Sequence, residues 1–129
     1  MKHLYIYQQA NNNYNYGYNY NNQPPSTCYF YNTLLEGELD LGDFINLEKL
    51  SISGIGGGHN QQQELTNLKI NNCTKLVNLT INFTTLTSLN IDKNISLQTL
   101  NCNNNRVGSL NLSNNPSLNT FYYENNCSH

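Results

Sequence analysis

The sequence predicts a mainly β protein in which short parallel strands stack one repeat upon the next, forming a short solenoid. Three observations predict it. A leucine phrase recurs every 10 or 11 residues, two phrases make a period of 21, and asparagine follows the phrase at a fixed offset. Because Leu-x-Ile alternation has the period of a strand, each phrase is expected to bury every second side chain. A chain of 129 residues suits one domain of this kind.

The phrase Leu-x-x-Leu-x-Ile/Leu is clearest from residue 65 to residue 123, and its central residues are Leu68, Leu79, Leu89, Leu100, Leu110 and Phe121. The same spacing continues backwards to Leu50 and Leu39, apart from a Gly- and Gln-rich insertion at residues 54–63. About four 21-residue repeats are therefore expected over residues 39–126. No single repeat can bury its own apolar face, so the leucines should share one continuous core.

Asparagine recurs five residues after the central position of the phrase, where a turn is expected. The slot is occupied by Asn94, Asn105, Asn115 and Asn126, by Cys73, and elsewhere by Phe44, Ile55 and Thr84. Because the amide has both a donor and an acceptor, a column of these side chains can satisfy turn backbone groups in neighbouring repeats. The column should be weakest where Phe, Ile or Thr stands.

This pattern resembles the leucine-rich repeat family, and in particular its 21-residue class, which carries two strand phrases per repeat and occurs in fungal and bacterial proteins. The stretch from Leu86 to Asn105 is the clearest example, and the resemblance extends over residues 35–126. It implies a solenoid with parallel strands. It also implies that a protein partner would dock on the exposed strand positions of one sheet.

Outside the repeats, composition sets the expected boundaries. Residues 1–25, rich in Asn, Tyr and Gln, are expected to be a disordered low-complexity leader, because they hold too few aliphatic side chains to offset the entropy of ordering. Residues 26–38 are expected to cap the first repeat, and residues 127–129 to be a short tail. The insertion at 54–63 is expected to be a loop.

Charge and cysteine content exclude several classes of function. Only 11% of residues are charged, with six Lys and Arg and a net charge of −2, which argues against nucleic-acid binding. No apolar stretch is long enough to cross a membrane, and no secretory signal is recognisable. The four cysteines are too widely spaced for a disulfide framework or a metal pair, so reduced thiols and a cytoplasmic location are expected.

The chemistry-bearing residues predict no enzyme, no cofactor and no metal site. Gly54–Gly58 lacks the ending of a phosphate loop, and His59 has no nucleophile in a recognisable motif. The expected function is a non-catalytic scaffold for protein–protein interaction. Its candidate partner-binding residues, on one strand face, are Thr80, Asn82, Asn101, Asn103, Tyr122 and Glu124. Two alternatives stay open: a self-assembling structural element that associates end to end, and a fragment of a longer repeat array.

Overall fold

A computed structural model describes residues 1–8, 26–56 and 62–126 of the chain. The strands in these ranges are β1 (His3–Tyr7), β2 (Thr27–Phe30), β3 (Glu36–Asp40), β4 (Lys49–Ser53), β5 (Glu64–Lys69), β6 (Asn78–Asn82), β7 (Thr99–Asn101) and β8 (Thr120–Tyr122). Most of the predicted leader (9–25), part of the predicted insertion loop (57–61) and the predicted tail (127–129) lie outside the described residues. Within those described ranges no helix could span a membrane.

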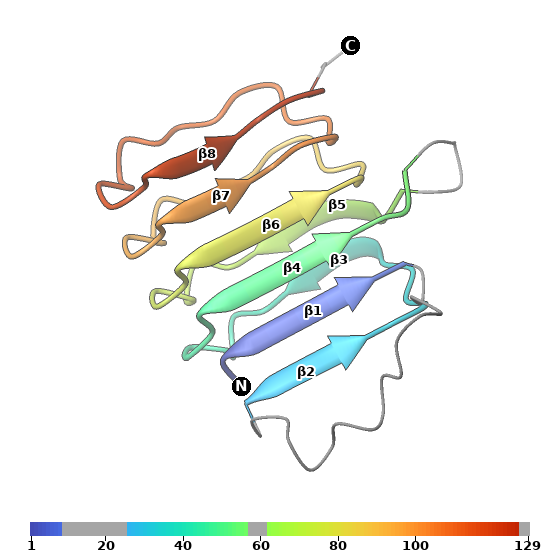
Figure 1. Ribbon diagram of the computed structural model, residues 1–129, viewed down its shortest axis with the longest axis horizontal. Coiled ribbons are helices and arrows are strands. Elements are labelled where there is room, and N and C mark those ends of the chain that lie inside the picture. Colours follow the sequence, from blue (N-terminus) through green and yellow to red (C-terminus); the bar gives the residue numbers. More distant parts are fainter. Residues whose placement is uncertain (9–25, 57–61, 127–129) are drawn as a thin grey trace.

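The strands form two parallel sheets. The larger has six strands in the order β2-β1-β4-β6-β7-β8, and the smaller pairs β3 with β5 behind it (Figure 1). In the larger sheet Leu50 is opposite Leu79, Leu79 opposite Leu100, and Leu100 opposite Phe121. These offsets are 29, 21 and 21 residues, which equal the predicted period, with eight extra residues at the insertion. The strand pairing therefore follows the spacing of the leucine phrase.

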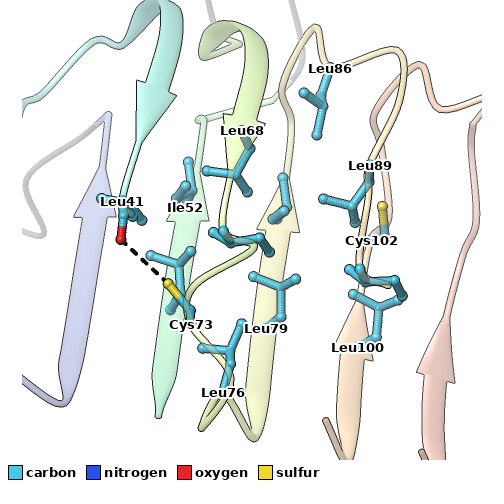
Figure 2. Close-up of a cluster of buried hydrophobic side chains, with 14 of the residues drawn as sticks. Leu41, Ile52, Leu68, Cys73, Leu76, Leu79, Leu86, Leu89, Leu100 and Cys102 are labelled. Carbon is cyan, nitrogen blue, oxygen red and sulfur yellow. Dashed lines mark hydrogen bonds between the residues drawn. The ribbon is translucent and has the colours of Figure 1, made fainter. Parts of the chain in front are cut away.

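The core lies between the six-stranded sheet and the segments opposite it, and it consists mainly of leucines and isoleucines of the phrase, with Cys73 and Cys102 among them (Figure 2). Leu47, Leu65, Leu79, Leu97 and Leu100 have no exposed surface at all. Burial of each such side chain stabilises the fold by about 1.5–3 kcal/mol before entropy is counted. At the β8 end the corresponding positions are less covered, since the side chain of Phe121 is 41% exposed.

Strand β1 corrects the predicted boundary of the leader. Residues 3–7, expected to be disordered, form a strand between β2 and β4. The reason is local: Leu4 and Ile6 repeat the Leu-x-Ile alternation of the later strands, and they are only 4% and 5% exposed. Leu4 lies opposite Leu50 and Ile6 opposite Ile52, so this short segment is in register with the repeats. The fold thus includes His3–Tyr7, which precede the low-complexity stretch in the chain.

The first phrase of each of the two later repeats, centred on Leu89 or Leu110, differs from the expectation in another way. Residues 86–91 and 107–112 form no strand, so the smaller sheet contains only β3 and β5 among the described residues. Even so, Leu86 is fully buried and Ile91 is 1% exposed. Side-chain burial holds these segments in place without a ladder of backbone hydrogen bonds to a neighbouring strand.

The asparagine slot forms two columns, one on each side of the core. In the first column, Asn115 Nδ2 donates to Asn94 O (3.1 Å) and Ile91 O (3.0 Å), and Asn94 Nδ2 donates to Cys73 O (3.0 Å). Cys73 Sγ in turn lies 3.5 Å from Leu41 O, a contact that Figure 2 marks. Each side chain thus satisfies carbonyls of the preceding repeat, as the sequence predicts.

The second column uses both ends of the amide. Asn105 Nδ2 donates to Ile81 O (2.8 Å), while Asn105 Oδ1 accepts hydrogen bonds from Thr84 N (3.2 Å) and Thr84 Oγ1 (2.7 Å). Asn126 Oδ1 likewise accepts a hydrogen bond from Val107 N (3.1 Å). Thr84, expected to weaken the column, instead donates to the asparagine of the next repeat.

Candidate docking face

The outward side of the six-stranded sheet is the candidate functional surface. Alternation along each strand places Thr80 on the side opposite Leu79 and Ile81. The register then sets Ser51, Thr80, Asn101 and Tyr122 in one row across β4, β6, β7 and β8. The predicted residues therefore lie together on one face. Tyr122, 49% exposed, is the most prominent of this row.

The asparagines of this face are bonded to one another rather than free. The Asn82 amide is oriented so that its nitrogen faces acceptors and its oxygen faces donors. In this orientation Asn82 Nδ2 donates to Asn101 Oδ1 (2.9 Å) and to Asn103 O (3.3 Å). Asn103 Oδ1 accepts a hydrogen bond from Glu124 N (2.7 Å). The network holds these side chains in place, so the polar part of the face is a preorganised array of amides.

The structure adds to this face four tyrosines that were not among the predicted partner-binding residues. Tyr5 and Tyr7 on β1 stack with Tyr29 and Tyr31 in and just after β2. Ring centroids of Tyr5 and Tyr29 are 4.8 Å apart at 12° between planes, and those of Tyr7 and Tyr31 are 5.6 Å apart at 28°. We call these four residues the tyrosine cluster. Because Tyr5 is opposite Ser51, the cluster continues the row that contains Thr80 and Tyr122.

A signal for the cluster was present in the sequence. The alternation of Leu4, Tyr5, Ile6 and Tyr7 has the period of a strand and places both tyrosines on the side away from the buried pair. It was hidden because the Asn/Tyr tract that follows has the same composition as these tyrosines. Composition alone therefore assigned both to one disordered leader.

Burial raises the pKa of the Tyr7 phenol above its ordinary value, an effect partly offset by a hydrogen bond with Ser51, and the neighbouring phenols of Tyr5 and Tyr29 raise it further. The Tyr7 hydroxyl accordingly remains protonated near neutral pH and can both donate and accept hydrogen bonds. The cluster thus offers aromatic rings and neutral polar groups together.

On the opposite side of the molecule, the smaller sheet carries charge. Lys69 Nζ lies 3.3 Å from Glu38 Oε1, and both side chains are about half exposed. Such an exposed pair stabilises the fold little. Among the described residues, this side also offers no set of aromatic anchors comparable to the tyrosine cluster. Comparisons with protein-family models, curated proteins and solved structures find no match to this chain.

Proposed function

We propose that this chain is a leucine-rich repeat solenoid and a non-catalytic scaffold that binds a protein partner. Three features support the family proposal: registers offset by 21 residues, a core of phrase leucines, and asparagines that bond carbonyls of the preceding repeat. Cytoplasm is the proposed compartment, since Cys28, Cys73 and Cys102 are free thiols.

The proposed docking surface is the outward face of the six-stranded sheet, from the tyrosine cluster to Tyr122. The tyrosine cluster is the observation that carries this proposal. Interface hot spots are enriched in tyrosine, and stacked rings lose little conformational entropy when they are buried by a partner. The asparagine network beside it is already ordered and can form the polar part of an interface.

Capture experiments with the full chain test this proposal. The immobilised chain is exposed to native lysate and the bound proteins are quantified. Tyr5→Ser and Asn101→Ser remove one aromatic and one polar contact from the face, and both variants should lose the same captured protein. Lys69→Ser changes the opposite side and should retain it. Equal capture by all three variants would exclude the outward face as the docking surface.

A further inference from the structure

We propose that successive copies of this chain associate head to tail, with β8 of one copy pairing in parallel with β2 of the next. The two strands are the ends of the six-stranded sheet, and they point the same way (Figure 1). Among the described residues β2 pairs only with β1, and β8 only with β7. Within the ranges that the structure describes, each therefore presents one row of unpaired backbone N–H and C=O groups.

Apart from being short, the two strands lack the features that usually prevent edge-to-edge pairing. Natural sheets protect their edges with short strands, lysine, proline, bulges or inward-pointing charges. Strand β2 reads Thr-Cys-Tyr-Phe and β8 reads Thr-Phe-Tyr, without a charge or a proline in either. At the two edges Phe30 is 50% exposed and Phe121 41% exposed, although their positions in the register face inward. Pairing would bury both rings.

The two edges also match position by position. Across the sheet, Tyr29 and Tyr122 occupy the same row, because Tyr29 is opposite Tyr5 and Tyr122 is opposite Asn101. A second copy displaced by one strand position would therefore bring its Tyr122 beside Tyr29. There it would extend the existing stack of Tyr5 on Tyr29 by one ring. In the inward row, Phe121 of the second copy would lie against Cys28.

The interface proposed here is heterologous, since two different edges meet. A contact of that kind joins copies head to tail, and it gives an open chain unless the rotation between copies closes a ring. The pairing of two short strands buries little surface, so association in about the micromolar to millimolar range is expected. This self-association goes beyond the proposed docking face, because it uses the two edges of the sheet and needs no other protein.

Sedimentation velocity of the purified full chain over a concentration series tests the proposal. The wild type should form dimers and longer species as its concentration rises. Tyr29→Lys blocks the β2 edge and Tyr122→Lys the β8 edge, so each variant alone should stay monomeric. Thr80→Lys places the same charge in the same row of the interior strand β6 and should associate like the wild type. Circular dichroism spectra that match the wild type show that each variant is folded.

Mixing the two edge variants makes the test decisive. Tyr29→Lys keeps an intact β8 edge and Tyr122→Lys an intact β2 edge, so an equimolar mixture should form dimers and nothing longer. A mixture that stays monomeric overturns the proposal, and so does a wild type that stays monomeric up to about 1 mM. Dimers of Tyr29→Lys alone would show symmetric pairing of β8 edges, which also overturns it. The double variant Tyr29→Glu, Tyr122→Lys should regain association at low salt.

Discussion

Replacement of Asn105 by alanine should be among the most damaging single changes to the stability of this fold. The side chain is only 5% exposed, and it forms hydrogen bonds with Thr84 and Ile81 of the preceding repeat as well as with Cys102 and Asn103 of its own. Its loss leaves Thr84 N, Thr84 Oγ1 and Ile81 O without the bonds that Asn105 supplies. Each buried polar group left unpaired costs about 1–3 kcal/mol, so the free energy of unfolding should fall by about 3–5 kcal/mol. That is a large part of the total stability of a typical domain.

Asn115 provides an internal comparison, since it occupies the other column. Its Nδ2 also donates to two carbonyls, but its Oδ1 has no hydrogen-bond partner among the described residues. Asn115→Ala therefore leaves only Ile91 O and Asn94 O unpaired and removes a buried acceptor that was itself unsatisfied. The expected loss is about 2–3 kcal/mol, less than for Asn105→Ala.

Urea unfolding of the two variants, followed by circular dichroism, measures these losses. Asn119→Ala is the matched control, because Asn119 is exposed and the expected change is within about 0.5 kcal/mol. The expected order of destabilisation is Asn105, then Asn115, then Asn119. An Asn105→Ala variant as stable as Asn119→Ala would refute the argument that side-chain amides satisfy the turn backbone.

Two further predictions concern Gly56 and Cys102. Gly56→Ala should lower the free energy of unfolding by more than about 1 kcal/mol in urea unfolding, because φ is +85° there and a Cβ would lie 2.6 Å from the Phe83 ring. Gly42→Ala is the control, because its φ is ordinary and the nearest atom to the added Cβ, Asp40 Oδ1 at 3.0 Å, ends an exposed side chain that can move. Burial raises the pKa of the Cys102 thiol to about 11, an effect that a hydrogen bond from Asn105 partly offsets. Because the thiol of the unfolded chain ionises at a lower pH, the free energy of unfolding should fall as pH rises from about 9 to about 11. Unfolding measured against pH checks the sign, and Cys102→Ala should reduce this decline; an unchanged slope would contradict it.

The sequence could predict the repeated part of this fold because burial imposes a period that survives in one chain. Leu50, Leu79 and Leu100 lie opposite one another as their spacing required, and Asn94 and Asn105 bond neighbouring repeats as their shared offset suggested. Strand formation at Leu89 and Leu110 was predicted on the same grounds and does not occur. Periodicity reports which side chains are buried, and burial does not require a ladder of backbone hydrogen bonds.

Strand β1 could not be placed from the sequence by the same reasoning. In the chain, β1 comes before β2 and is separated from it by a long polar tract. In the sheet, however, β1 lies between β2 and β4, so the order of the strands in the sheet differs from their order in the chain. Spacing arguments need neighbours at a constant interval, and His3–Tyr7 has none. Only its alternation of Leu4, Tyr5 and Ile6 marks it as a strand. The tyrosine cluster was missed for this reason, while the row from Thr80 to Tyr122 was found.

One geometric rule connects the docking face with the edges. Because the strands of the six-stranded sheet are parallel and in register, residues at equivalent positions of successive strands lie side by side in one row. Tyr5 and Tyr29 stack within one molecule because they occupy the same row on adjacent strands. In the proposed edge pairing, Tyr122 of a second copy would lie beside Tyr29 for the same reason. Tyr29 and Tyr122 belong both to the proposed docking face and to the two edge strands, whereas Thr80 and Asn101 are interior to the sheet. A partner that covers the tyrosine cluster should therefore compete with self-association, and a partner confined to the interior strands should not.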